Sequence, residues 1–153
     1  MEEKIHILFY NHSSKKLIEL DIKPAIRHYI NLLHIDYLDS FNHEDIKISG
    51  ESFQILYFDG PIEEARKLPI TVLKDGMPFI RGSFIIGRCN DDGNLSSLSK
   101  DDVALIEKQY GFIFWKCPQS KKDFYSYGIK VDGVQESIYI KNSKDKNNRV
   151  LLN

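Results

Sequence analysis

The stretch RGSFIIGRCNDDGNLSSLSKDD, residues 81–102, decides the fold because it holds a strand, a turn and a helix start in that order. Apolar side chains occupy both faces of residues 79–89, which predicts one central strand with neighbours on either side. Residues 90–94 are turn formers, and Ser99 precedes Asp102 with the spacing of a capping box at a helix N-terminus. We therefore expect a buried strand followed by a turn and a helix.

Two helices are expected around this stretch. Pro24 fits the first position of one helix. Proline lacks a backbone N–H, and at this position the N–H group would have no partner within the helix. Its apolar side chains recur at helical spacing and predict a core face of Ile26, Tyr29, Ile30 and Leu33. The helix that starts at Ser99 is expected to end at Gly111, a residue typical of helix C-termini. Residues 62–68 fit one further helical turn.

Runs of strand-forming residues bounded by turn residues account for most of the remaining chain. They predict strands at 5–10, 17–20, 35–41, 46–48, 53–58, 70–73, 112–115, 124–127, 129–131 and 138–140. The polar segment 142–153 is typical of a mobile tail. We predict a single α+β domain, residues 1–153, with a mixed, mostly antiparallel sheet and two packed helices.

Composition indicates a folded chain of ordinary size. Of 153 residues, 42% are hydrophobic and 12% aromatic, which is far from the disordered regime. The formal net charge of −1 is too small for a DNA mimic or a general polyanion binder. Residues 112–153 are nevertheless basic, with eight Lys or Arg residues against four Asp or Glu.

The sequence predicts a cytoplasmic protein. Glu2 and Glu3 stand where a secretory signal needs positive charge, and no run is long enough to cross a membrane. Cys89 and Cys117, the two cysteines, are too few for a disulfide framework or a four-thiolate zinc site.

None of the familiar reaction-centre motifs is complete. Counted from Asn90 as a calcium loop, the sixth position is Leu95 where glycine is required. The glycines match neither a dinucleotide-binding nor a P-loop pattern, and the five histidines form no metal-ligating pair. We therefore predict no enzyme activity, no metal and no cofactor, although a triad could still assemble from distant residues.

The C-terminal aromatic and basic residues are the most suggestive candidates for binding. Aromatic rings could stack on bases while lysines meet phosphates. Alternatively, the rings alternate into a sheet core and the lysines keep its edge solvated. The candidate ligand- or partner-binding residues are Arg81, Arg88, Trp115, Lys121, Lys122, Tyr125 and Tyr127. Strand parity would put Arg81 and Arg88 on opposite faces unless a bulge intervenes.

Two stretches together resemble the phage- and plasmid-borne domain-of-unknown-function family 3846. They are LYFDGPIEEARKLPIT, residues 56–71, and IRGSFIIGRCNDDGNLSSLSKDDVALIEKQY, residues 80–110. Ser83 stands where that family commonly has threonine, and the asparagine usual after Leu-Pro is replaced by Ile70 or Thr71. The resemblance covers roughly residues 17–111 and implies a mobile-element origin, with no established activity or catalytic residues. The β extension 112–141 lies outside it.

Three functions fit these features. The first is a non-enzymatic accessory protein of a phage or mobile element that binds a host or phage protein, which predicts an exposed apolar or aromatic patch. The second is an anti-defence protein that sequesters a small nucleotide signal, which predicts a pocket with convergent arginine, lysine and aromatic groups. The third is single-stranded nucleic-acid binding, which predicts strong salt dependence. A homo-oligomer is compatible with each.

Overall fold

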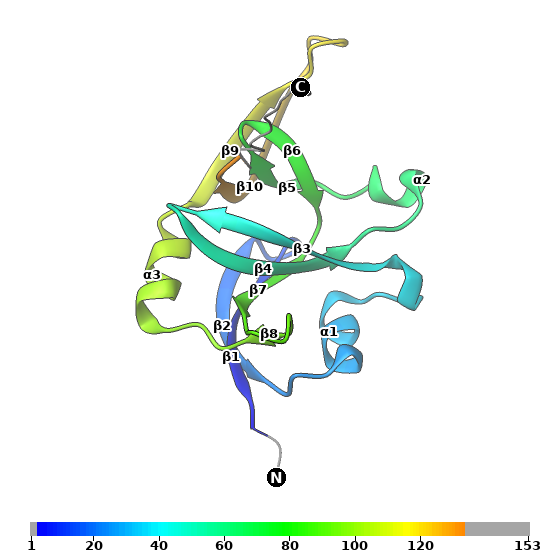
Figure 1. The fold of residues 1–153 in the computed structure, drawn as a ribbon. Helices are drawn as coiled ribbons and strands as arrows, with labels where there is room; N and C mark the ends of the chain where they lie inside the picture. Colours follow the sequence, from blue (N-terminus) through cyan, green and yellow to red (C-terminus); the bar gives the residue numbers. More distant parts are fainter. Residues whose placement is uncertain (1–2, 134–153) are drawn as a thin grey trace, which may run out of the picture.

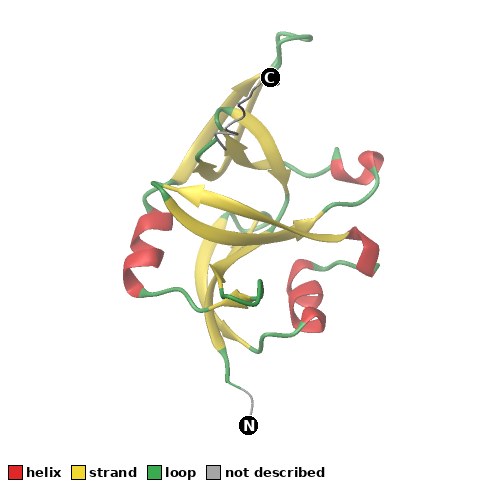
Figure 2. Ribbon diagram, in the orientation of Figure 1, coloured by secondary structure: helices red, strands yellow, loops and turns green. Residues whose placement is uncertain are grey.

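The structure, a computed structural model, describes residues 3–133 and consists of two sheets with helices at their flanks (Figures 1 and 2). The first sheet has the antiparallel order β2–β1–β7–β4–β3, and a short strand β8 pairs with β7. Its strands are β1 (Ile5–Asn11), β2 (Lys16–Ile22), β3 (Phe41–Ile48), β4 (Glu51–Phe58), β7 (Phe84–Cys89) and β8 (Leu95–Ser96). The α+β class predicted from the sequence is confirmed.

The second sheet has the order β6–β5–β10–β9, and only the β5–β10 pair in it is parallel. Its strands are β5 (Ile70–Lys74), β6 (Met77–Arg81), β9 (Tyr110–Lys116) and β10 (Asp123–Val131). The helices are α1 (Ile26–Leu33), α2 (Ile62–Ala65), α3 (Lys100–Glu107) and the 3₁₀ turn η1 (Leu38–Ser40). No helix within residues 3–133 combines the length and the apolar character needed to cross a membrane.

Strand β7 is central, as its two apolar faces predict. Phe84 and Ile86 belong to the core that the first sheet shares with α3 and the second sheet. Ile85 points the other way and packs with Tyr29 and Leu33 of α1. Each face of the first sheet is therefore covered by other elements of the chain.

The single strand expected over 79–89 is wrong: the chain passes there from one sheet to the other. Gly82 has a φ of +83°, a conformation that favours glycine, and it separates β6 from β7. The buried Thr71 hydroxyl donates to the Gly82 carbonyl oxygen at 2.7 Å, which stabilises this corner. The corner leaves Arg81 and Arg88 in different sheets.

The start of α1 and the end of α3 differ from the predicted helix boundaries. Helix α1 begins at Ile26 after an extended Ala25, so Pro24 precedes the helix, and Ile26 is exposed instead of in the core. Helix α3 ends at Glu107, and Gly111 lies opposite Gly128 in the β9–β10 ladder. Pairing with β10 thus overrides the expected C-cap.

Several predicted strands have different limits. Residues 35–40 contain η1, and β3 runs without interruption from Phe41 to Ile48. The segments 124–127 and 129–131 form one strand, β10, because Gly128 continues the ladder. The predicted strand 138–140 and tail 142–153 lie outside the described residues.

The predicted turn and helix start after β7 are confirmed. The side-chain oxygen of Asn90 accepts hydrogen bonds from the backbone N–H groups of Asp92 and Asn94, at 3.0 and 2.9 Å. Ser99 and Asp102 form a reciprocal capping box at the start of α3. The acidic loop is thus held by its own asparagine.

Candidate functional site

The β9–β10 hairpin carries five of the seven candidate residues and extends beyond its sheet (Figure 1). Strand β5 pairs only with Ile129–Val131 of β10, whereas β9 pairs with β10 from Tyr110 to Lys116. In the part of the chain that the structure describes, β9 has no second neighbour and forms a sheet edge. The distal hairpin therefore presents two faces and one backbone edge.

One face of the hairpin is an exposed cluster of four aromatic rings, here called the outer aromatic face. It consists of Phe112, Phe114, Tyr125 and Tyr127, each between 40% and 60% exposed. Ring centroids lie 5.2 Å apart for Phe114 and Tyr125 and 5.5 Å apart for Phe112 and Tyr125. The Phe112 and Tyr127 rings meet edge to face at 5.7 Å. The rings thus form one continuous patch.

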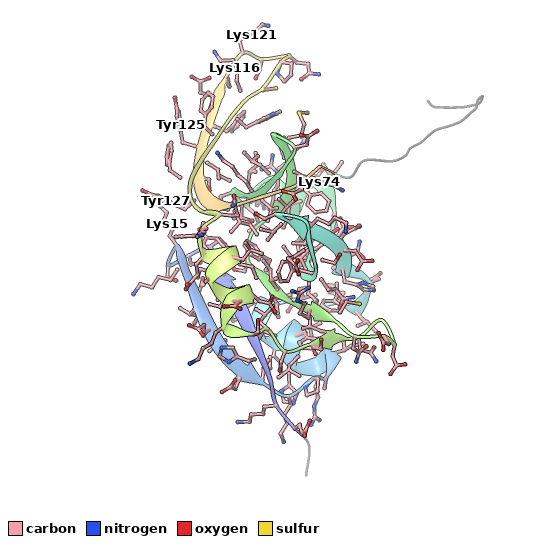
Figure 3. The ribbon with its side chains drawn as sticks, turned by 60° about the vertical axis from the view of Figure 1, so that its left-hand side comes forward. Lys15, Lys74, Lys116, Lys121, Tyr125 and Tyr127 are labelled. Atoms are coloured by element: carbon pink, nitrogen blue, oxygen red, sulfur yellow. The ribbon has the colours of Figure 1, made fainter. Side chains whose placement is uncertain are left out.

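Lysines border the outer aromatic face (Figure 3). The Lys15 ammonium lies 5.7 Å from the centre of the Tyr127 ring. Lys116 pairs with Asp123 across the hairpin at 3.4 Å, and the exposed Lys121 and Lys122 lie in the loop at its tip. The border therefore carries positive charge together with one carboxylate.

The opposite face of the hairpin bounds a cavity of about 330 Å³, here called the inner cavity. Trp115 and Phe124 line it from the hairpin, with ring centroids 5.4 Å apart. Phe114 and Tyr125 of the outer aromatic face also border it. Arg81 lines it from β6, and Arg66 and Lys67 from the segment after α2. Arg81 donates from Nη1 to the Leu68 carbonyl oxygen at 2.9 Å.

Arg88 is not brought to either face of the hairpin. Its guanidinium donates to Asp102 and Glu51 and lies 4.7 Å from the centre of the Phe53 ring. The pKa of Arg88 is raised, chiefly by its hydrogen bond to Asp102 and next by that to Glu51. Through these contacts Arg88 links α3 to the first sheet.

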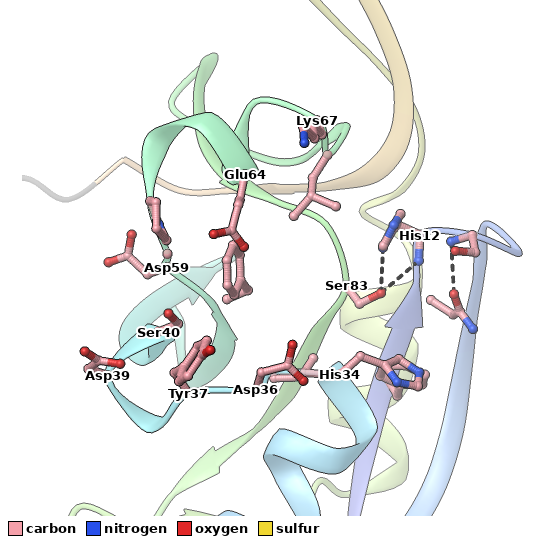
Figure 4. Close-up of a pocket in the computed structure, with 18 residues that line it drawn as sticks. His12, His34, Asp36, Tyr37, Asp39, Ser40, Asp59, Glu64, Lys67 and Ser83 are labelled. Carbon is pink, nitrogen blue, oxygen red and sulfur yellow. Dashed lines mark hydrogen bonds between the residues drawn. The ribbon is translucent and has the colours of Figure 1, made fainter.

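A larger cavity, about 990 Å³, lies between the end of β1, the segment after α1 and α2 (Figure 4). Its charged lining is mainly acidic, and we call it the acidic cavity. The ionisable residues are His12, His34, Asp36, Asp39, Asp59, Glu64 and Lys67, with Tyr37 beside them. Within the described residues, no three His, Cys, Asp or Glu side chains are grouped as a metal would need.

A histidine and a serine meet at the edge of the acidic cavity. Ser83 Oγ accepts the backbone N–H of His12 at 3.1 Å and lies 2.9 Å from its Nδ1. Burial lowers the pKa of His12, and the nearby His34 lowers it further, so the neutral ring is favoured. A nucleophile–base pair also needs a group that orients the base. Among the described residues, no carboxylate hydrogen-bonds His12, and the contact fastens the β1–β2 turn to the β6–β7 corner.

Sequence reasoning missed Lys15, Arg66 and Lys67 at the hairpin, and His12 with Ser83. Lys15 is far from the β9–β10 hairpin in sequence. It lies in the turn between β1 and β2, and the fold brings this turn next to Tyr127. The adjacent cations in EEARKLP were the available signal for Arg66 and Lys67. No local pattern could pair His12 with Ser83, since residues that meet in space need not be close in sequence.

Comparison of the chain with models of known protein families, with curated proteins and with solved structures finds no match. The resemblance to family 3846 therefore stays a prediction from the quoted residues.

Proposed function

We propose that the protein is a non-enzymatic accessory protein of a phage or other mobile element that binds another protein through the outer aromatic face, in the host cytoplasm. The observation that carries the proposal is the exposure of four contiguous rings on one side of a projecting hairpin. Contiguous exposed apolar patches on folded domains typically mark interaction surfaces. The mobile-element origin rests on the resemblance to family 3846.

Three features support a protein as the partner. Tyrosine and phenylalanine rings are enriched at protein interfaces, where they bury a large apolar area. The adjacent edge of β9 offers unpaired backbone groups to which an extended segment of a partner can add as a strand. The lysine border suits a partner with acidic groups around an apolar centre.

Single-stranded nucleic acid is the second candidate ligand for the same face. Exposed rings beside Lys15, Lys116 and Lys121 resemble the stacking platforms on which bases lie. Asp123, however, pairs with Lys116 on this face and would oppose a phosphate backbone. These charges favour the protein partner.

The test is site-specific cross-linking in an extract of the host cells. A photoreactive p-benzoylphenylalanine replaces Phe112 or Tyr127, which belong to the outer aromatic face and do not line the inner cavity. The same group at Ile62, exposed on α2, is the control position. We expect a protease-sensitive adduct of one defined mass from the two hairpin positions only. Adding Phe112→Ser to the protein labelled at Tyr127 should reduce its yield roughly tenfold, as for an interface hot spot.

Three outcomes contradict the protein-binding proposal. A nuclease-sensitive adduct that disappears at high salt would instead support nucleic-acid binding. An adduct between two copies of this chain would make the outer aromatic face a self-association surface. Equal labelling from Ile62 and from the hairpin would show that the face has no specific partner.

A further inference from the structure

The inner cavity lies against the side of the hairpin that carries Trp115 and Phe124. Trp115 and Phe124 form one wall, and Ile70 and Leu73 of β5 provide apolar packing beside them. Its volume of about 330 Å³ is at the lower end of the range typical of small-molecule sites. A ligand of modest size therefore fits better than a polymer.

The charged side chains that line the inner cavity are all cationic. They are Arg66, Arg81 and Lys67, the last of which also lines the acidic cavity; no Asp or Glu lines the inner cavity. Within residues 3–133, none of the three forms an ion pair. The bond from Arg81 to the Leu68 carbonyl orients the guanidinium and leaves its other N–H groups free to donate. Cations without carboxylate partners favour an anionic ligand, and guanidinium groups match phosphate geometry.

The aromatic wall selects the shape of that ligand. The Trp115 and Phe124 rings are tilted by 31° with centroids 5.4 Å apart, and Trp115 is half-buried. Indole and phenyl faces bind planar heterocycles by stacking. A planar ring against this wall would place an attached phosphate toward the cationic side of the cavity.

We propose that the inner cavity binds a free nucleotide, with the base against Trp115 and Phe124 and the phosphate held by Arg66, Lys67 and Arg81. Phe114 and Tyr125 of the outer aromatic face also border the inner cavity, whereas Phe112 and Tyr127 do not. Variants at Phe112 or Tyr127 and variants of the cavity's cationic residues can therefore test the two proposals independently.

The test uses Trp115, the protein's single tryptophan, as an internal reporter. Purified full-length protein is titrated with AMP, GMP, ADP and 3′,5′-cyclic AMP, and calorimetry provides a readout that does not depend on nucleotide absorbance. At least one of these nucleotides should change Trp115 fluorescence saturably, with a Kd below about 1 mM. Adenosine alone and inorganic phosphate alone should each bind at least about tenfold more weakly, because each lacks one of the two contacts.

Charge variants locate the site. Arg81→Gln should weaken binding roughly tenfold or more. The double variant Arg66→Gln, Lys67→Gln should do the same, and both positions are exposed, so folding is preserved. Lys108→Gln, at an exposed residue after α3, is the matched control and should bind as the unaltered protein does.

The proposal is overturned if none of the four nucleotides binds with a Kd below about 1 mM by either readout. It is also overturned if Lys108→Gln weakens binding as much as Arg81→Gln. Binding that occurs only with oligothymidylates and tightens with their length would replace the free nucleotide with a nucleic-acid strand.

Discussion

Arg88 in β7 donates two hydrogen bonds to the carboxylate of Asp102 in α3, from Nε to Oδ2 at 3.0 Å and from Nη2 to Oδ1 at 2.7 Å. Asp102 is buried and also accepts the backbone N–H of Ser99 at 2.9 Å. One carboxylate thus caps the helix and ties it to the first sheet. This geometry explains why α3 begins at a fixed place over the core.

Asp102→Ala should destabilise the fold by about 2–3 kcal/mol, because it removes charge-assisted hydrogen bonds and half of the capping box. Part of the Arg88 side chain is exposed and keeps Glu51 as a partner, which moderates the loss. Asp101→Ala, at the exposed neighbouring position, should cost less than about 1 kcal/mol. Urea unfolding at neutral pH measures both, and equal losses would contradict the role given to Asp102.

The same contact makes stability depend on pH. The hydrogen bond from Arg88 is the main cause that holds the pKa of Asp102 below its ordinary 3.8. Since the folded-state pKa is the lower one, ionised Asp102 stabilises the fold fully above about pH 4. That contribution is lost as pH falls through the folded-state pKa. The free-energy difference between the unaltered protein and Asp102→Asn should therefore shrink on acidification. A constant difference down to about pH 2 would contradict this assignment.

Strand β7 and the N-cap of α3 were predictable because their signals are local. Ser99 and Asp102 lie one turn apart, and the apolar alternation of β7 is visible in consecutive residues. The separation of the strands into two sheets could not be predicted. It depends on the positive φ of Gly82 and on a hydrogen bond from Thr71, eleven residues earlier. A glycine in an apolar run fits equally well inside one strand.

The residue types of the candidate site could be predicted from the sequence. The face of the hairpin on which each residue lies could not. Aromatic residues in 112–127 could face a core or a ligand, and the structure divides them between the two faces of one hairpin. Trp115 lines the inner cavity, and Tyr127 belongs to the outer aromatic face alone. Tyr125 belongs to the outer aromatic face and also borders the cavity. Which face stays open depends on β5, which pairs with only the end of β10 and is remote in sequence.

The pKa values of His6 and His12 should be shifted in opposite directions from the ordinary value. Hydrogen bonds to Asp21 and then to Glu19 raise the pKa of His6 above 6.5, whereas burial lowers that of His12 below 6.5. Protonated His6 therefore adds stability below about pH 6.5, which is lost as pH rises through its folded-state pKa. NMR titration of both rings is the measurement, and Asp21→Asn should lower the pKa of His6 alone. An unchanged His6 pKa in Asp21→Asn would contradict the pairing of His6 with Asp21.

Gly128 controls how the hairpin joins the second sheet. A Cβ added there would lie 1.8 Å from the Thr71 carbonyl oxygen, so β5 and β10 must separate to admit even alanine. Gly111, directly opposite in β9, has open space around the same position and is the matched control. We expect Gly128→Ala to cost about 2–3 kcal/mol or more, and Gly111→Ala to stay within about 1 kcal/mol.

Urea unfolding gives both values, and nucleotide titration of the Gly128→Ala protein extends the test to function. The inner cavity lies between the hairpin and β5, so a displaced hairpin should weaken binding there even in variant protein that stays folded. Gly111→Ala should leave binding unchanged. If the two alanine variants were equally stable, the close approach of β10 to Thr71 would not constrain the fold, and the hairpin would be free to move relative to β5.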